Sequence, residues 1–268
     1  MRPGEELLDD PIEWGRLLIQ TNDHDPLYVG LSRWDVKGSR LRRFLLAYWC
    51  CYSVGASWWL SQHSGTRFWN WLEVAARNEE PSPIGGRWPR AHERRHWRGQ
   101  KCVESVAKLR TMKSHPEELV LSLEGFKRLN EVERAVTQWP QFGPWIAFKA
   151  ADMLERVLGC PIWFPDDIIT LYKDPRKGAD MAAEVMGLAG PAAVIIDMYE
   201  AYGGMIAPGF GDNAARLVNI QEIETVLCKW KSARNGHYWI GMDTQSHRSE
   251  LENWGAQDLL DVYPRMDP

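Results

Sequence analysis

The sequence lacks the features that mark secreted, membrane-spanning or iron–sulfur proteins. Its five cysteines are an odd number and include no C-x-x-C pair, so we expect free thiols in a reducing compartment and no four-cysteine cluster. The N-terminus has no apolar signal-peptide region, and the longest apolar stretch, near residues 44–60, is interrupted by Ser53, Gly55 and Ser57. We therefore expect a cytoplasmic protein without a membrane partner.

The chain also lacks an excess of positive charge. Its 32 Lys and Arg residues face 36 Asp and Glu residues, which gives a formal net charge of −4. A surface that is basic throughout is excluded, so binding to nucleic acid must use a local basic patch. One candidate patch is present at residues 87–101, where six Lys or Arg residues accompany a single acid, Glu93.

Arginine suits phosphate because its planar guanidinium donates two parallel hydrogen bonds to one phosphate group. A second basic site surrounds Trp230, which two lysines flank, and basic residues beside an aromatic ring also suit strand contact. We expect the substrate phosphate to be bound by Arg94, Arg95, His96, Arg98, Lys229 and Lys231. The ordinary alternatives are a solvated charged helix face at residues 87–101 and surface lysines beside a core tryptophan.

Tryptophan, by contrast, is abundant, with fifteen residues. Core packing is the ordinary use of such rings, and base stacking on nucleic acid selects the same flat side chains. Apolar residues recur at helical spacing, for example at positions 132, 135, 136 and 139. No Gly/Ser linker or low-complexity tract divides the chain. We therefore predict a mainly α protein, in which residues 1–268 form a single helical catalytic domain or two closely packed lobes.

The same patterns predict individual elements. We expect an irregular lead-in over residues 1–40, helices over 41–60 and 68–76, and a loop over 79–90, which holds three prolines and two glycines. Further helices begin at Pro191 and after Asn219, which is a suitable cap. Ser114-His115-Pro116-Glu117 fits a capping box at the start of another helix.

The most informative stretch is Trp139-Pro140-Gln141-Phe142-Gly143-Pro144-Trp145. Pro140 ends the preceding helix because it has no N–H group, Gly143 permits a positive φ, and Pro144 suits the first turn of the next helix. This predicts helix, short hairpin, helix, within a core at residues 128–170. The unpaired N–H groups at the second helix start would hold a nucleic-acid phosphate. We expect DNA contacts from Gln141, Phe142, Gly143, Trp145 and Lys149.

Two adjacent carboxylates follow the second helix, in Phe164-Pro165-Asp166-Asp167-Ile168. Burial raises the pKa of a carboxyl group, and a neighbouring carboxylate opposes the ionisation of both. An aspartate in such a place serves as a general base or stabilises developing positive charge. The competing interpretation is that Asp166 or Asp167 caps the next helix, and the spacing alone does not separate the two.

The stretch Phe142-Gly143-Pro144-Trp145-Ile146-Ala147, with Phe164-Pro165-Asp166-Asp167 one helix later, resembles the helix-hairpin-helix DNA glycosylase superfamily. In that superfamily the hairpin holds phosphate and an aspartate just beyond the second helix does the chemistry. The resemblance implies a glycosylase-like helical fold and a catalytic role for Asp167, more than for Asp166. Bifunctional members carry a lysine nucleophile in or just before the hairpin. Gln141 stands there in this chain, so lyase activity is not expected.

Further segments extend the resemblance to the phage amino acid:DNA transferases. They are residues 44–49 (FLLAYW), 93–99 (ERRHWRG), 227–232 (LCKWKS) and 236–238 (GHY). That family replaces an activated phosphate ester on 5-hydroxymethyluracil in DNA with the amine of an amino acid, which gives a hypermodified thymine. The resemblance implies a transferase that flips its target base, needs no cofactor and acts in the host bacterial cytoplasm. Its partners would be double-stranded DNA carrying a modified thymine and a free amino acid, with glycine a candidate.

Two other functions remain open at this point. A base-excision glycosylase would use Asp167 to support cleavage of the glycosidic bond, and a non-catalytic DNA-binding protein would use only the hairpin. The literal H-E-x-x-H of residues 92–96 is the zinc-binding pattern of metalloproteases. Two arginines crowd that would-be cation site, and Pro89 and Gly99 leave little room for a long helix. We therefore predict no metal, although the motif itself stays open.

Overall fold

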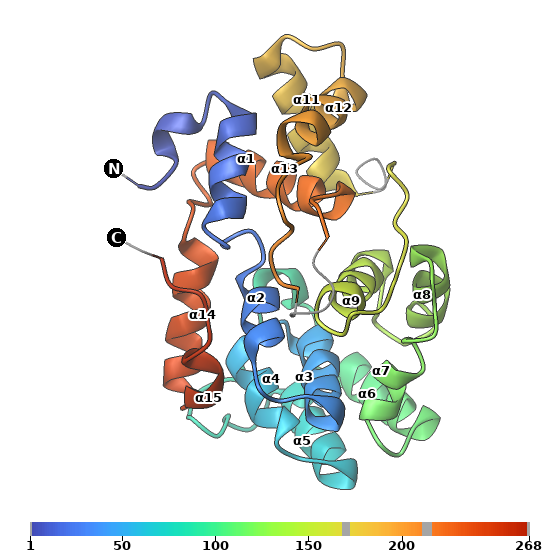
Figure 1. Ribbon diagram of the computed structural model, residues 1–268. Coiled ribbons are helices and arrows are strands. Elements are labelled where there is room, and N and C mark those ends of the chain that lie inside the picture. Colours follow the sequence, from blue (N-terminus) through green and yellow to red (C-terminus); the bar gives the residue numbers. More distant parts are fainter. Residues whose placement is uncertain (1, 168–171, 211–215, 267–268) are drawn as a thin grey trace. The chain divides into compact units, whose positions relative to one another are not determined.

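The computed structural model describes residues 2–167, 172–210 and 216–266 (Figure 1). In these ranges the chain forms fourteen α-helices and two short 3-10 helices. An isolated β-bridge joins Ile206 to Leu217, and the described ranges contain no β-strand. The prediction of a mainly α protein is therefore confirmed.

Two compact units emerge from the contacts within the chain. Unit 1 is drawn from residues 1–33, 163–246 and 263–268, and unit 2 from residues 34–162 and 247–262. Each unit combines segments that are distant in the sequence, and no change of composition marks where one gives way to the other.

Unit 1 is organised around α13 (Ile220–Arg234). Three helices pack against it, namely α1 (Pro11–Gln20), α11 (Lys173–Met186) and α12 (Pro191–Tyr202), as Figure 1 shows. The other elements are η1 (Glu5–Leu7), α2 (Pro26–Arg33) and the start of α14 (Met242–Asn253). Trp14, Tyr202 and Trp230 are each at most 1% exposed and form the centre of this packing.

The start of α13 follows the sequence prediction. Asn219 accepts a hydrogen bond from the N–H of Gln221 at 2.9 Å, and Glu222 accepts one from the N–H of Asn219 at 2.9 Å. This reciprocal pair is a capping box, which satisfies N–H groups that the helix itself leaves unpaired. The prediction that a helix begins at Pro191 is confirmed by α12.

A glycine lets α11 lie directly against α13. A Cβ at Gly178 would overlap the backbone carbonyl of Leu227 on α13, so a larger residue forces the helices apart. We expect Gly178→Ala to lower the free energy of unfolding by about 1–3 kcal/mol, the usual cost of overpacking. At Gly204 a Cβ meets nothing within 4 Å, and Gly204→Ala is the control. Urea denaturation followed by tryptophan fluorescence measures both, and equal losses would contradict the close approach.

Unit 2 is organised around α3 (Gly38–Cys51), whose apolar side chains are almost wholly buried. Helices α4 (Val54–Ser61), α7 (Glu117–Leu121) and α9 (Pro144–Arg156) pack against it. The other elements are α5 (Gly65–Arg77), η2 (His92–Arg94), α6 (Gln100–Met112), α8 (Leu129–Val136), α15 (Gln257–Leu260) and the rest of α14. Helix α5 pairs with α6, and α8 pairs with α9.

Three local predictions differ from the structure. Residues 41–60 form two helices, because Tyr52 adopts a left-handed φ of 52° and Ser53 caps α4. The expected irregular lead-in contains α1 and α2, and Asp10 caps α1. No side chain caps α7, which follows Pro116, so the predicted capping box at Ser114 does not form. Helix α5 and the loop over 79–90 agree with prediction.

Among the described residues, no single helix combines the length and the apolar character needed to cross a membrane. The pair α11 and α12, bent by 82°, meets those criteria only when its two helices are taken together.

Candidate active site

Residues 137–143 join α8 to α9 in unit 2, and the two helices pack against each other. The predicted helix, short turn and helix are confirmed. The positive φ, however, belongs to Gln141 at 68°, whereas Gly143 has an extended φ of −103°. Gly143 instead forms the start of α9, where it has no side chain to cover the N–H groups of the first turn.

Three of the residues expected to contact DNA lie at the surface of this turn. Gln141 and Gly143 are exposed, and Trp145 is half-buried. The Trp145 ring packs against that of Tyr52, with 5.2 Å between centroids. An exposed, uncapped helix start beside a partly exposed aromatic ring is suited to a phosphate group and an adjacent base or sugar.

The other two residues expected to contact DNA lie in the interior. Phe142 is 5% exposed and packs edge-on against Trp139, with ring centroids 5.3 Å apart. Lys149 is 7% exposed, and its ammonium lies over the ring of Phe148 at 5.1 Å. Both side chains therefore lie in the interior of unit 2 rather than at its surface.

The basic segment is also divided between interior and surface. Arg94, expected at the substrate phosphate, is 2% exposed. Its guanidinium donates to the carbonyl oxygens of Cys50 at 3.1 Å and Gln141 at 2.9 Å. Burial is the main cause that lowers the pKa of Arg94, although an arginine side chain still carries its charge at neutral pH. Arg94 is therefore committed to backbone carbonyls inside unit 2.

Arg90 plays a comparable part in the same segment. Its guanidinium donates to the carbonyl oxygens of Trp88, Trp97 and Ala75. Burial lowers the pKa of this guanidinium as well. Three carbonyls bound by one side chain hold the residues around η2 against the end of α5, which fixes the segment without any regular helix.

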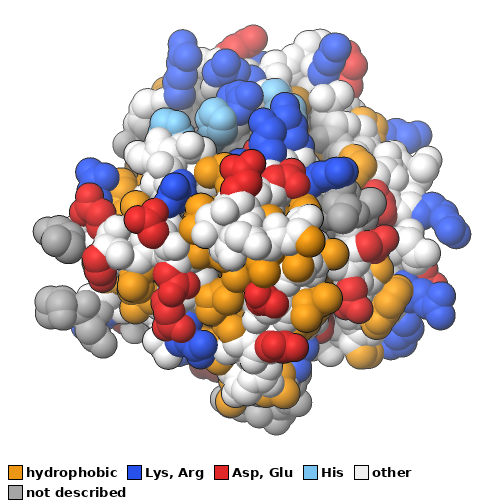
Figure 2. Space-filling view, turned by 90° about the horizontal axis from the view of Figure 1, so that it is seen from above, with side chains coloured by type: hydrophobic (Ala, Val, Ile, Leu, Met, Phe, Trp, Pro, Cys, Tyr) orange, Lys and Arg blue, Asp and Glu red, His pale blue; other side chains and the backbone are white. Residues whose placement is uncertain are grey.

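Arg95, His96 and Arg98, all expected at the substrate phosphate, are exposed, and so are Arg87 and Lys101 of the same segment. Arg95 lies 2.7 Å from His92 between Nη1 and Nε2. Burial, followed by the charges of Arg94 and Arg95, lowers the pKa of His96. Figure 2 shows Lys, Arg and His side chains gathered along one edge of the face that it draws. These three residues remain available to bind phosphate.

The H-E-x-x-H motif does not form the helix that zinc binding would require. His92–Arg94 is a single 3-10 turn, and the residues that follow it are turns and bends up to the start of α6. Its two histidines therefore do not lie one α-helical turn apart on a common face. Within the ranges that the structure describes, no group of three or more His, Cys, Asp or Glu side chains is placed to hold a metal ion.

Asp166 and Asp167 occupy an exposed turn of unit 1, directly after the buried Phe164. Asp166 accepts a hydrogen bond from the hydroxyl of Tyr199 on α12 at 3.2 Å. Burial, and then the charge of Asp166, raise the pKa of Tyr199, so its phenol stays protonated and donates. Residues 168–171, where a helix capped by either aspartate would begin, lie outside the described residues.

A polar cluster beside Tyr199 was not predicted from the sequence. The charges of Glu222 and Arg216 reach Tyr199 and act on its pKa. Arg216 binds Glu222 between Nη1 and Oε2 at 2.7 Å, and it donates to Gln221 Oε1 at 2.7 Å. Glu222 is wholly buried. The capping signal at Asn219 accounts for this glutamate locally, so no sequence pattern indicated its second partner, Arg216.

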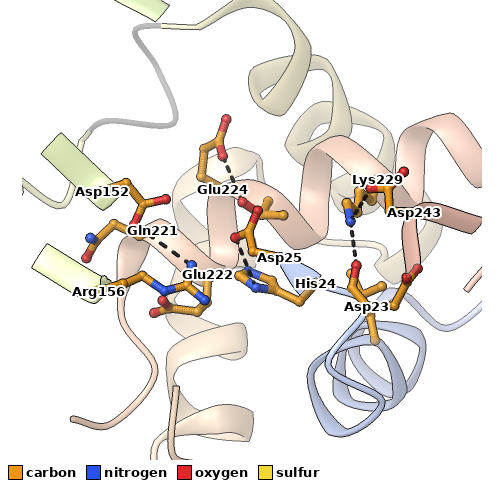
Figure 3. A network of polar contacts seen from close by, with 12 residues as sticks. Asp23, His24, Asp25, Asp152, Arg156, Gln221, Glu222, Glu224, Lys229 and Asp243 are labelled. Atoms are coloured by element: carbon orange, nitrogen blue, oxygen red, sulfur yellow. Dashed lines mark hydrogen bonds and ion pairs between the residues drawn. The ribbon is translucent and has the colours of Figure 1, made fainter. Parts of the chain in front are cut away.

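Lys229 and Lys231, expected at the substrate phosphate, are each bound to an acid in unit 1. Lys229 Nζ lies 2.7 Å from Asp243 Oδ2 and donates to the carbonyl oxygen of Asp23 (Figure 3). Lys231 Nζ lies 2.6 Å from Asp174 Oδ1. These partners neutralise both ammonium groups, so a phosphate would have to displace a carboxylate to bind either lysine.

Asp23-His24-Asp25, directly before α2, is the second unpredicted group in unit 1. Three adjacent titratable residues between two helices are the signal that could have found it. His24 and Asp23 are wholly buried, and His24 Nδ1 lies 3.1 Å from Asp25 Oδ2 (Figure 3). Burial by itself lowers the pKa of Lys229, but the carboxylates of Asp243, Asp23 and Asp25 outweigh it and raise that pKa.

Helix α9 of unit 2 carries a buried ion pair one turn from its end. Arg156 Nη1 lies 3.8 Å from Asp152 Oδ1, and each residue is at most 1% exposed. Taking both charges out of water is costly, so a well-packed apolar pair would serve stability as well or better.

The comparisons with known proteins agree with one another. The profile of a family described as amino acid:DNA transferase matches residues 20–237 of the chain. A glycinyltransferase of Pseudomonas phage PaMx11 is 40% identical over 283 residues, covering 95% of this chain and 96% of that protein. A putrescinyltransferase of Delftia phage PhiW-14 is 28% identical over 267 residues, covering 94% and 82%. The span matched by the family includes the hairpin and both aspartates.

Proposed function

This chain belongs to the amino acid:DNA transferase family, and from that premise we propose that it transfers the amine of glycine onto a phosphate-activated 5-hydroxymethyluracil base in double-stranded DNA. The observation that supports glycine as the amine substrate is the 40% identity to a phage glycinyltransferase over 95% of the chain. The putrescinyltransferase is the more distant of the two relatives, at 28% identity. An amino acid is therefore the better candidate than a diamine.

The reaction is a displacement at the methylene carbon attached to C5 of the uracil ring. The amine nitrogen forms a bond to this carbon while the bond from carbon to the ester oxygen breaks, and phosphate leaves with the bonding electrons. Glycine is an ammonium ion at neutral pH, so it must first lose a proton to become a nucleophile. A carboxylate close to the reacting carbon accepts that proton, which is the role that we assign to Asp167, beside Asp166.

DNA binding falls to the turn between α8 and α9, used as the helix-hairpin-helix unit of a glycosylase-like fold. The uncapped start of α9 supports this assignment, because its outward N–H groups and the helix dipole favour a backbone phosphate. The exposed Gln141 and Gly143 and the half-buried Trp145 surround that position. The target base then leaves the stack, at a cost of a few kcal/mol.

The leaving phosphate requires a cationic site of its own. Arg95, His96 and Arg98 support this role because they are exposed and because guanidinium groups stabilise phosphate charge as it develops. Lys229 and Lys231 are weaker candidates, since each already binds a carboxylate.

Nucleoside mass spectrometry tests the proposal directly. Double-stranded DNA that contains phosphorylated 5-hydroxymethyluracil is incubated with the protein and with glycine, putrescine or other amino acids in separate reactions. We expect an intact strand whose modified base has exchanged phosphate for glycine, with little product from putrescine. Abasic sites would instead identify a glycosylase, and DNA that is bound but chemically unchanged would identify a binding protein.

A further inference from the structure

Arg94 lies where three segments of unit 2 meet. Its Nε binds the carbonyl oxygen of Cys50 at the end of α3, and its Nη1 binds the carbonyl oxygen of Gln141 in the hairpin, at 3.1 and 2.9 Å. The guanidinium also lies over the ring of Phe142, 5.1 Å from its centroid. Arg94 is 2% exposed, and its buried Nη2 has no hydrogen-bond partner among the described residues.

Gln141 is the position in the hairpin that most needs an anchor. A residue other than glycine keeps a φ of 68° only where its surroundings enforce it. The side chain of Gln141 is exposed, so the contact that stabilises this φ is made by its backbone, through the carbonyl that Arg94 binds. Ser105 of α6 holds the preceding carbonyl, that of Pro140, at 2.5 Å. Two successive peptide groups just before Gly143 are thus fixed from the core.

We infer that Arg94 is a positioning residue for DNA binding, which clamps the Gln141 carbonyl to the end of α3 and so sets where the start of α9 presents its N–H groups. The inference rests on the proposed function, because it takes the hairpin to be the contact to DNA phosphate. Arg94 itself touches no DNA. A lysine cannot replace it, since one ammonium group lacks the planar fork that spans two carbonyls and stacks on a ring.

Salt dependence separates this role from a direct contact. Each phosphate neutralised by a basic side chain adds about 0.9 to the slope of log affinity against log salt, whereas backbone N–H contacts release few ions. If Arg94 acts by positioning, Arg94→Lys and Arg94→Gln both weaken DNA binding by about tenfold. The slope of log affinity against log salt then stays at the wild-type value. If Arg94 binds phosphate, the lysine variant stays close to wild type and the glutamine variant loses about 0.9 of slope, which would overturn the inference.

Steady-state kinetics supply a second readout. For both variants we expect the KM for DNA to rise with Kd, while kcat and the KM for glycine stay within about twofold of wild type. Arg43→Lys is the matched control, because Arg43 donates to the carbonyl oxygen of Ser61 and pairs with Glu117, and these bonds reach neither the hairpin nor the basic segment. It should lower Tm and leave Kd unchanged. An equal loss of DNA affinity in Arg43→Lys would mean general destabilisation and would overturn the inference.

Gln141→Val tests the same interaction by changing the hairpin residue, while Arg94 is kept. A β-branched residue is strongly disfavoured at positive φ, so this variant should reproduce the loss of affinity. Combined with Arg94→Lys, it should bind no more weakly than the weaker single variant, because both remove one interaction. Unchanged affinity in Gln141→Val overturns the inference even if the Arg94 variants fail to fold.

Failure of this inference is distinct from failure of the proposed function. Wild-type protein that neither binds DNA nor transfers glycine refutes the proposed function, and the role of Arg94 falls with it. Wild-type protein that does both, alongside Arg94 variants that behave like wild type, refutes only the role of Arg94.

Discussion

Asp167→Asn is expected to slow the transfer of glycine to DNA by about 10²- to 10⁴-fold, the usual contribution of a general base. Asparagine has nearly the same size as aspartate, but its amide cannot take the proton from the incoming ammonium. Asp167 lies in an exposed turn, so its side chain is not part of the buried core. Single-turnover transfer onto phosphate-activated DNA measures the rate, and a parallel titration should show DNA affinity within about twofold of wild type.

Variants of other acidic residues test which carboxylate acts as the general base. Asp180→Asn, at an exposed position on α11, should transfer glycine at the wild-type rate. Asp166→Asn and Tyr199→Phe test the neighbouring carboxylate and the hydroxyl that donates to it. A wild-type rate for Asp167→Asn together with a slow Asp166→Asn would move the role of base to Asp166. Wild-type rates for both would show that neither aspartate is catalytic.

Asp23→Ala is expected to lower the free energy of unfolding by about 3–5 kcal/mol, the range for removing one partner from a buried charged network. The Asp23 carboxylate is wholly buried and accepts from the hydroxyl of Tyr238, from the N–H of Gly241 and from both the N–H and the hydroxyl of Thr244. Alanine leaves these donors without an acceptor in the interior. Because Gly241 and Thr244 flank the start of α14, we expect that helix end to fray first.

Urea denaturation and amide hydrogen exchange at Gly241 and Thr244 measure this effect. Asp9→Ala is the control, since Asp9 binds Arg234 with its side chain 94% exposed. Exposed ion pairs contribute no more than about 1 kcal/mol, so its effect should be small. A loss of stability from Asp23→Ala no larger than that from Asp9→Ala would contradict a structural role for the buried carboxylate.

Features encoded by neighbouring residues were predictable. Pro140 and Pro144 place a turn between two helices because proline cannot continue the first and suits the start of the second. Asn219 caps α13 as expected, and Glu222 completes a capping box with it. The position of the positive φ was not predictable in the same way. Gly143 permits that conformation, yet Gln141 adopts it, and Arg94 binds the Gln141 carbonyl from a segment 47 residues away.

Three residues expected at the DNA or phosphate site take part in interior packing, for a common reason. Phe142, Lys149 and Arg94 were expected to contact DNA or phosphate and lie in the interior. Composition and spacing identify a basic or aromatic residue, but they do not reveal which face of its element meets the core. A buried arginine that binds carbonyls and an exposed arginine that binds phosphate look identical in a sequence.

The sequence by itself determined the helical class, the turn at residues 137–143, the two adjacent aspartates and, through its resemblances, the transferase family. These depend on local backbone chemistry and on residue identity, both of which a linear chain records. The tertiary structure alone decided which arginines point inward, which lysines are neutralised and that Asp23 is a buried acceptor. Each of these depends on groups brought together from distant parts of the chain, where burial and partner charges, rather than neighbours in sequence, set the free energy of a side chain.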